Sequence, residues 1–301
     1  MIAALFPGQG SQLVGMAKDF YEHSPAAKAV LDKAETALPR LLRLMFDGPE
    51  DELKLTANQQ PALVAASAAA FAAYKEAGGA TPHYAAGNSI GEYSAHVAAG
   101  SLSITDAIRL VHKRGTYMQE AVPEGLGAMA AILKVDKELV AKVCAETEGI
   151  VEISNLNSPG QTVISGETDA VARAAEKLKE ERARVTLLPV SAPFHCSLMQ
   201  PAADNLAKDL EDIKFRQPAF GIVCNVTADL LEDISQAKRL LTEQVTAAVR
   251  WTETVEKLTS LGVTRYLEFG SGKVLTSLVG RILDKPDAKA VTDMASLREA
   301  L

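Results

Sequence analysis

Short apolar runs alternate with longer stretches of helical periodicity along this chain. Residues 2–6 form an apolar run that ends at Pro7-Gly8, the pattern of a buried strand closed by a turn. Residues 84–93 predict a strand, a sharp turn and the start of a helix. Helical spacing predicts further helices, with Pro61 as a start signal for the second: 24–38, 61–76 and 105–120. This alternation favours an α/β sheet.

A different pattern occupies residues 126–193, where strands and helices follow in the order βαββαβ. That order is typical of a ferredoxin-like unit. We therefore predict a large α/β domain formed by residues 1–125 and 194–301, with a small ferredoxin-like subdomain inserted over 126–193. The elements expected in the insertion are strand 127–133, helix 136–147, strands 150–155 and 161–166, helix 167–180 and strand 184–190.

After the insertion the pattern returns to alternating strands and helices. The expected elements are helix 196–211, strand 221–225, one long helix over 237–261 around Trp251, strand 264–269 and helix 272–283.

Composition and charge narrow the class of protein. With 301 residues, 48% hydrophobic and 23% charged, the chain is a folded globular protein and not a disordered or collagen-like one. A net charge of -7 argues against a nucleic-acid partner. The longest uncharged apolar run, 61–74, is shorter than the roughly 20 residues that cross a bilayer, and no signal peptide is evident. We expect a cytoplasmic protein without a membrane partner.

The three cysteines carry no recognisable site. Cys144, Cys196 and Cys224 lie far apart and form no C-x-x-C pair. Neither a disulfide framework nor a metal site is expected from this spacing.

The segment Gly87-x-Ser89-x-Gly91 matches a nucleophile elbow, in which small neighbours let a serine sit on a tight strand-to-helix turn. Such an elbow makes the large domain α/β-hydrolase-like. It also places the amide of Ile90 at a helix N-terminus, where it can stabilise an oxyanion. The alternative is a glycine-flanked turn whose serine caps the following helix.

A nucleophilic serine needs a base within hydrogen-bond reach. Of the five histidines, His96 follows Ser89 by two helical turns and lies too far along the axis. His195, at the exit from the insertion, is the best candidate, although a structural histidine is an alternative. The other three lie in surface-like contexts: His23, His83 and His112.

A glycine-rich loop follows the first strand. Gly8-Gln9-Gly10 suggests a dinucleotide loop, but Leu13 stands where the third glycine would fall, so this interpretation fails. The loop can still turn the Gln9 amide inward, beside that of Ile90, to form an anion hole. The alternative is an ordinary glycine-rich turn.

Six segments in order resemble the motifs of the malonyl-CoA:acyl carrier protein transacylases, over nearly the whole chain. They are Phe6-Pro7-Gly8-Gln9-Gly10-Ser11-Gln12, Gln59-Gln60-Pro61-Ala62-Leu63, Gly87-Asn88-Ser89-Ile90-Gly91-Glu92-Tyr93-Ser94, Arg114-Gly115-x-x-Met118-Gln119, Pro193-Phe194-His195 and Gly270-Ser271-Gly272-Lys273-Val274-Leu275.

The resemblance implies a role for each matching residue. Ser89 would be the nucleophile and His195 its general base, while the Gln9 and Ile90 amides would form the oxyanion hole. Arg114 would bind the malonyl carboxylate, which suits a planar guanidinium that can form a bidentate pair. The alternative for Arg114 is a surface helix charge paired with an acid. The remaining implied substrate-binding residues are Gln60, Met118 and Phe194, the last favouring malonyl over methylmalonyl groups by its bulk.

Two positions depart from the family pattern. Asn88 precedes the nucleophile, where the family usually has histidine, and we expect altered tuning without loss of activity. Thr246-Ala247-Ala248 stands before Trp251, where the family often has an Asn-Pro or Ser-Pro step whose carbonyl orients the catalytic histidine. We expect the Ala247 carbonyl to take that role.

The function implied is a ping-pong malonyl transfer from malonyl-CoA to the thiol of a holo acyl carrier protein, for fatty-acid or polyketide synthesis. It implies a monomer that uses its CoA thioester as substrate without a metal or other cofactor.

Lys113, Lys273 and Arg281 are candidates for a basic patch that meets the acidic carrier. The alternatives are a serine thioesterase or editing acyl hydrolase with the same Ser-His pair, and a non-catalytic carrier-docking module.

Overall fold

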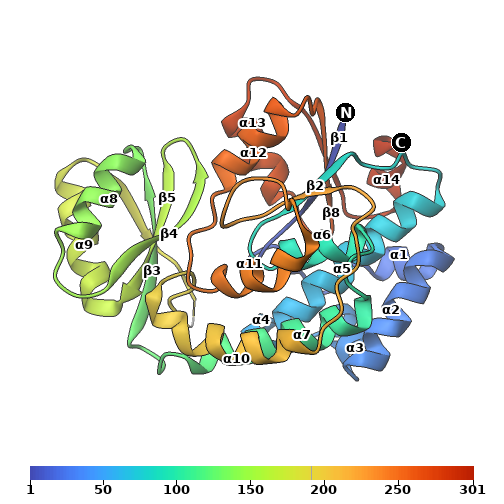
Figure 1. Cartoon of the computed structure of the whole chain (residues 1–301), viewed down its shortest axis with the longest axis horizontal. Coiled ribbons are helices and arrows are strands. Elements are labelled where there is room, and N and C mark those ends of the chain that lie inside the picture. Colours follow the sequence, from blue (N-terminus) through green and yellow to red (C-terminus); the bar gives the residue numbers. More distant parts are fainter. Residues whose placement is uncertain (191) are drawn as a thin grey trace.

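The chain folds around two separate sheets, in a computed structural model that describes residues 1–190 and 192–301 (Figure 1). The larger sheet is parallel and has the order β7-β2-β1-β8-β9. Its strands are β1 (Ile2–Phe6), β2 (Tyr84–Gly87), β7 (Gly221–Val223), β8 (Arg265–Phe269) and β9 (Asp287–Val291).

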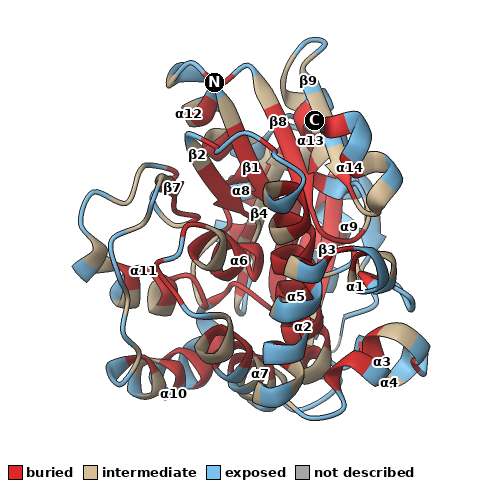
Figure 2. Ribbon diagram, turned by 90° about the vertical axis from the view of Figure 1, so that its right-hand side faces the viewer, coloured by how far each residue is buried: buried red, intermediate tan, exposed pale blue. Residues whose placement is uncertain are grey.

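Helices cover both faces of this parallel sheet, so its central strand β1 is apolar at successive positions. Ala4 and Phe6 belong to the core shared with α5 (Thr56–Glu76). Ala3 and Leu5 point to the opposite face, where Trp251 and α13 (Val274–Ile282) pack. Figure 2 shows the buried residues concentrated on these strands and on α5.

The remaining helices around the parallel sheet are α1 (Lys18–His23), α2 (Pro25–Ala37), α3 (Leu41–Asp47), α4 (Glu50–Lys54), α6 (Gly91–Ala98), α7 (Ile104–Glu120), α10 (Gln200–Glu211), α11 (Ala237–Glu243), α12 (Trp251–Ser260) and α14 (Met294–Ala300). Short 3-10 turns lie at Ser197–Met199 and Ile234–Gln236. Across the described ranges, no helix has both the length and the apolar character needed to cross a membrane.

The smaller sheet is antiparallel and has the order β4-β5-β3-β6. Its unit runs β3 (Gly127–Leu133), α8 (Lys137–Ala145), β4 (Val151–Ser158), β5 (Gln161–Glu167), α9 (Thr168–Glu180) and β6 (Arg184–Leu187). Alternate residues of β3 and β5 serve two cores: Ala130 and Ile164 pack under α8 and α9, whereas Met129 and Val163 join the main core. The predicted α/β fold with a ferredoxin-like subdomain is confirmed.

The start of α5 differs from the prediction, because Pro61 lies inside the helix and does not begin it. A proline has no N–H, so the carbonyl four residues earlier, that of Ala57, loses its helical donor. His112 from α7 replaces that donor, with Nδ1 2.8 Å from the Ala57 oxygen. A tertiary hydrogen bond therefore satisfies the carbonyl that the local sequence leaves free.

The single helix predicted over 237–261 is wrong, since α11 ends at Glu243 and α12 begins at Trp251. Between them, Val249 forms a parallel bridge with Asn155 of β4. The Val249 N–H donates to the Ser154 carbonyl at 2.9 Å, and the Val249 carbonyl accepts from the Leu156 N–H at 2.9 Å. These bonds replace helical ones and tie the connecting segment to the small sheet.

Several elements near the chain ends were not predicted. The edge strand β9 was not predicted, because its exposed Asp287 and Lys289 interrupt the apolar run that would indicate a strand. Helix α14 carries a capping box between Asp293 and Ser296, a signal that the sequence does contain.

We predict that Gly91→Ala destabilises the fold, because the new methyl would lie 2.0 Å from the Phe6 carbonyl oxygen at the end of β1. Relieving that clash should lower the free energy of unfolding by about 1–3 kcal/mol. The matched control is Gly280→Ala in α13, whose methyl meets nothing within 4 Å and should stabilise by up to about 1 kcal/mol. Urea unfolding, followed by circular dichroism, measures the free energy of unfolding of both variants. Equal unfolding midpoints for Gly91→Ala and Gly280→Ala would contradict the packing argument.

Candidate active site

Ser89 lies on a strained turn between β2 and α6. Its φ of 51° falls in the left-handed region, which a non-glycine residue adopts only at a cost. The flanking backbone is so close that a methyl on Gly87 would lie 1.9 Å from the Gly91 carbonyl carbon. The two glycines are therefore required by the turn, as a nucleophile elbow demands.

Asn225, just after β7, holds this turn from the side. Its Oδ1 accepts from the Ser89 N–H at 2.7 Å, and its Nδ2 donates to the Gly87 carbonyl at 2.6 Å. The side chain is fully buried. Sequence reasoning missed this residue, although a lone asparagine directly after a buried strand, at the carboxyl edge of a parallel sheet, is a usable signal.

His195 contacts the serine hydroxyl, with Nε2 2.7 Å from Ser89 Oγ. On the other side of the ring, Nδ1 lies 2.8 Å from the Gln244 carbonyl oxygen. A carbonyl can only accept, so Nδ1 carries the proton and Nε2 is free to accept one from the serine. The structure therefore places the His195 ring in hydrogen-bond contact with the Ser89 hydroxyl.

The carbonyl that orients His195 belongs to Gln244, and the prediction of Ala247 for this hydrogen bond is corrected. In the predicted continuous helix, the Gln244 carbonyl would accept a helical hydrogen bond. Because α11 ends at Glu243, this carbonyl is free to accept from His195. The Ala247 carbonyl acts on the same ring in the same sense, favouring its protonated form.

Burial, and to a lesser extent the charge of Arg114, lower the pKa of His195 to about 4, although the two carbonyls act to raise it. The imidazole is therefore neutral at neutral pH. A neutral imidazole bonded to a serine hydroxyl is ready to act as a general base.

Arg114 brings a buried positive charge to the same place. Its guanidinium is fully buried and donates from Nη1 to Gln60 Oε1 at 2.9 Å and from Nη2 to Gln244 Oε1 at 3.0 Å. Nη2 also lies 3.3 Å from Ser89 Oγ. The alternative of a surface helix charge is wrong. Burial lowers the pKa of Arg114, yet an arginine stays charged in proteins.

The other predicted substrate residues pack around this group. Gln60 is fully buried, and its Nε2 lies 3.6 Å from Met118 Sδ, so the side chain that accepts from Arg114 also contacts Met118. Phe194 is 5% exposed and packs into the main core immediately before His195.

The glycine-rich loop packs directly on the elbow. A methyl on Gly8 would lie 2.8 Å from the Asn88 carbonyl oxygen, so the segment that carries Gln9 touches the turn that carries Ile90. The Gln9 side chain turns away and donates from Nε2 to Gln59 Oε1.

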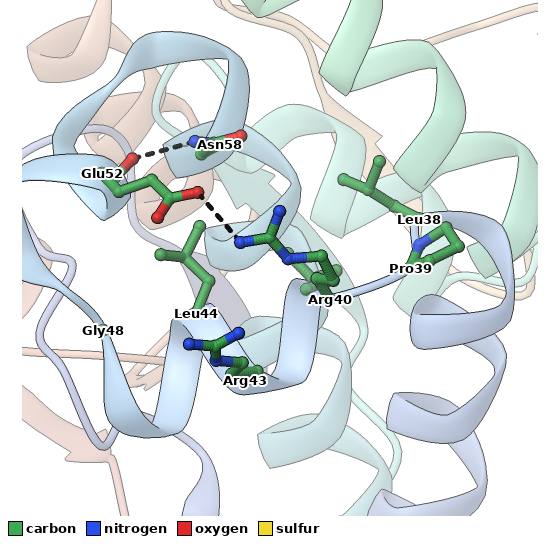
Figure 3. Close-up of a pocket in the computed structure, with 9 residues that line it drawn as sticks. Leu38, Pro39, Arg40, Arg43, Leu44, Gly48, Glu52 and Asn58 are labelled. Atoms are coloured by element: carbon green, nitrogen blue, oxygen red, sulfur yellow. Dashed lines mark hydrogen bonds and ion pairs between the residues drawn. The ribbon is translucent and has the colours of Figure 1, made fainter.

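A separate cavity of about 130 Å³ lies between α3 and the start of α5 (Figure 3). Arg40 and Glu52 face one another across it at 3.8 Å. It is lined by Leu38, Pro39, Arg40, Leu41, Arg43, Leu44, Gly48, Glu52 and Asn58. Because Ser89, His195 and Arg114 do not line it, we assign it no part in the chemistry.

No group of three or more histidine, cysteine, aspartate or glutamate side chains suited to a metal ion occurs in residues 1–190 and 192–301.

A serine on a strained elbow, a neutral imidazole bonded to it and a buried cation beside it can attack a carbonyl and hold a negatively charged acyl group. Fold and site together define a serine acyl-transfer enzyme of the α/β-hydrolase type. The comparison with known families agrees: residues 4–295 match the family described as acyl transferase domain, and the chain belongs to it.

Several relatives that match nearly the whole chain carry the name malonyl CoA-acyl carrier protein transacylase. The protein of that name from Bacillus subtilis (strain 168) is 45% identical over 100% of this chain and 96% of its own length. The protein of the same name from Escherichia coli (strain K12) is 45% identical over 99% of this chain and 98% of its own length. The resemblance inferred from the six sequence segments is confirmed.

Two solved structures are closely similar. One, a malonyl-transacylase in complex with its type II polyketide synthase acyl carrier protein, has a TM-score of 0.97 and 47% identity, covering 100% of this chain and 98% of the other. The second, an acyl carrier protein S-malonyltransferase from Vibrio cholerae O1, has a TM-score of 0.97 and 45% identity. The match covers 100% of this chain and 99% of the other.

The pKa of about 4 at His195 predicts the pH profile of serine acylation. Lowering the pH protonates Nε2 and removes the base, so the rate should fall tenfold per unit only below about pH 4. We expect less than a threefold change from pH 8 to pH 5, measured as the burst of CoA released from malonyl-CoA. Circular dichroism at each pH controls for unfolding. An acid limb centred near the ordinary histidine pKa of about 6.5 would contradict the assignment.

Proposed function

We propose that this chain transfers a malonyl group from malonyl-CoA to the phosphopantetheine thiol of a holo acyl carrier protein, through a malonyl-serine intermediate. One observation carries the proposal: Ser89 Oγ lies 2.7 Å from His195 Nε2 and 3.3 Å from Arg114 Nη2. Nucleophile, base and carboxylate-binding cation thus meet at one atom. The names of the relatives and of the similar structures support the same activity.

In the first half of the reaction, Ser89 Oγ attacks the thioester carbonyl while His195 Nε2 accepts the hydroxyl proton. The backbone amides of Gln9 and Ile90 stabilise the oxyanion of the tetrahedral intermediate. The carbon–sulfur bond then breaks, and the thiolate of CoA takes the proton from His195. The products are malonyl-serine and free CoA.

In the second half, the carrier thiol gives its proton to His195 and attacks the malonyl-serine ester. The ester C–O bond breaks and Ser89 Oγ recovers the proton, which leaves malonyl on the carrier. The Gln244 carbonyl holds Nδ1 where a triad would use a carboxylate. A thiolate is a good leaving group, so this weaker partner suffices.

Substrate selection follows from the charge next to the serine. The Arg114 guanidinium pairs with the free malonyl carboxylate, and the buried Gln60 and Met118 close the space behind it. The bulk of Phe194 favours malonyl over the branched methylmalonyl group. The same buried cation disfavours neutral esters, which argues against a general esterase.

The acidic carrier requires a basic surface near the site, and Lys113, Lys273 and Arg281 are the candidates. Lys113 is paired with Asp209 at 2.6 Å, and Arg281 donates to Gln161 Oε1 at 2.6 Å. Lys273 lies exposed immediately before α13. We infer that Lys273 and Arg281 contribute more than Lys113, since the ion pair with Asp209 reduces the field of Lys113.

The division into domains, the cellular location, the oligomeric state and the absence of a cofactor are also proposals. We propose that residues 126–193 act as the small subdomain and residues 1–125 with 194–301 as the catalytic domain. We further propose that the chain works as a cytoplasmic monomer with no cofactor besides its thioester substrates. The net charge of -7 and three buried free cysteines support a reducing compartment and no nucleic-acid partner.

The proposed reaction predicts a malonyl adduct on Ser89. Intact-protein mass after brief mixing with malonyl-CoA should show the adduct on the wild type and none on Ser89→Ala. Addition of holo acyl carrier protein should remove it and load the carrier. Free malonate without carrier loading would mean a thioesterase, and no adduct or turnover in either protein would mean a docking module.

Arg114→Ala should reduce kcat/KM for malonyl-CoA by about 100-fold, because a desolvated charge-assisted pair of about 2–3 kcal/mol is lost. Acetyl-CoA, which has no carboxylate, should become the better substrate. The matched control is Arg109→Ala, an exposed arginine on the same helix, which should retain the wild-type preference. CoA release measured with each thioester reports the ratio, and an unchanged ratio would refute the carboxylate-binding role.

A further inference from the structure

One residue that the mechanism uses only through its backbone touches three parts of the site with its side chain. Gln244 is fully buried just beyond α11. Its Oε1 accepts from Arg114 Nη2 at 3.0 Å. Its Nε2 donates to the Ser89 carbonyl at 3.1 Å and to Glu92 Oε2 at 2.6 Å.

These contacts fix the orientation of the amide. A guanidinium offers only donors, so the group that faces Arg114 must be the amide oxygen. The NH2 group then faces two acceptors, the Ser89 carbonyl and the Glu92 carboxyl. Every partner is matched in this orientation and none in the flipped one.

Glu92, in the first turn of α6, is a buried acid with no part in the proton transfers. It also accepts from the Asn225 N–H at 3.1 Å. Its charge acts on Arg114 through space, while the Gln244 amide hydrogen-bonds to both groups. Burial raises the pKa of Glu92 to about 7. The amide therefore lies between an acid and the cation that is proposed to bind an acid.

We propose that the Gln244 side chain is a positioning and specificity-determining residue, which orients the Arg114 guanidinium and keeps it from pairing with Glu92. A carboxylate in contact with Arg114 would occupy its two parallel donors and compete with a substrate carboxylate. An amide oxygen takes one donor without cancelling the charge. Gln60 does the same on Nη1 at 2.9 Å. Two neutral amides thus hold the cation without neutralising it.

This inference rests on the proposed malonyl transfer and makes a selectivity prediction of its own. Gln244→Glu keeps the shape and the backbone carbonyl but puts a carboxylate on Arg114. We expect kcat/KM for malonyl-CoA to fall at least 30-fold, mainly through KM, and the malonyl-to-acetyl ratio of kcat/KM to fall at least tenfold. Gln217→Glu, the same charge change at an exposed glutamine, is the control and should leave both values unchanged.

A second pair of variants tests the role of Glu92. Gln244→Met removes the amide at similar volume, so Arg114 can turn to Glu92 and malonyl-CoA use should drop at least tenfold. Adding Glu92→Gln to this variant removes the competing acid and should recover at least a third of the malonyl-to-acetyl ratio. This pair tests the role of Gln244 even where Gln244→Glu does not fold.

Two results would overturn the inference. Parallel loss of malonyl and acetyl activity in the Gln244 variants would mean that the side chain only supports the elbow or His195. A malonyl-to-acetyl ratio that the added Glu92→Gln does not improve would mean that Gln244 does not shield Arg114 from Glu92. Failure of the proposed function itself is distinguishable, because the wild type would then load no malonyl onto Ser89 or the carrier.

Discussion

The buried charge of Arg114 is the constraint around which the site is arranged. A guanidinium removed from water costs several kcal/mol unless its donors are satisfied. Acceptors for Nη1 and Nη2 come from Gln60 of α5, Gln244 of the segment after α11 and Ser89 of the elbow, whereas Nε has no hydrogen-bond partner among the described residues. Elements distant in sequence must therefore converge on one side chain of α7.

That convergence depends on how the two sheets are joined. The segment after α11 leaves the helical path because Val249 pairs with β4 of the small sheet. Gln244 keeps helical dihedral angles at the end of α11, and because the chain leaves the helix after it, its carbonyl is free to accept from His195 while its side-chain amide bonds Arg114. The small sheet thus affects the chemistry, although Ser89 lies at the carboxyl edge of the large one.

Burial also sets the proton chemistry. It lowers the pKa of His195, which keeps the base neutral, and raises that of Glu92, which lets an acid remain close to the site without a full charge. A carbonyl partner for Nδ1, in place of a carboxylate, makes His195 a weaker base than a triad histidine. This matches a reactive thioester and leaves Arg114 as the dominant charge at the site.

The sequence by itself determined most strands and helices, the ferredoxin-like order of 126–193, and Ser89 on its elbow, because these depend on local periodicity and on small residues at a turn. Only the tertiary structure decided that α5 runs through Pro61, that Gln244 lies outside a helix, and that Asn225 and Glu92 support the site. Each of these depends on a hydrogen bond between residues far apart in the chain. Local propensity carries no information about such partners, so pattern alone could not reveal them.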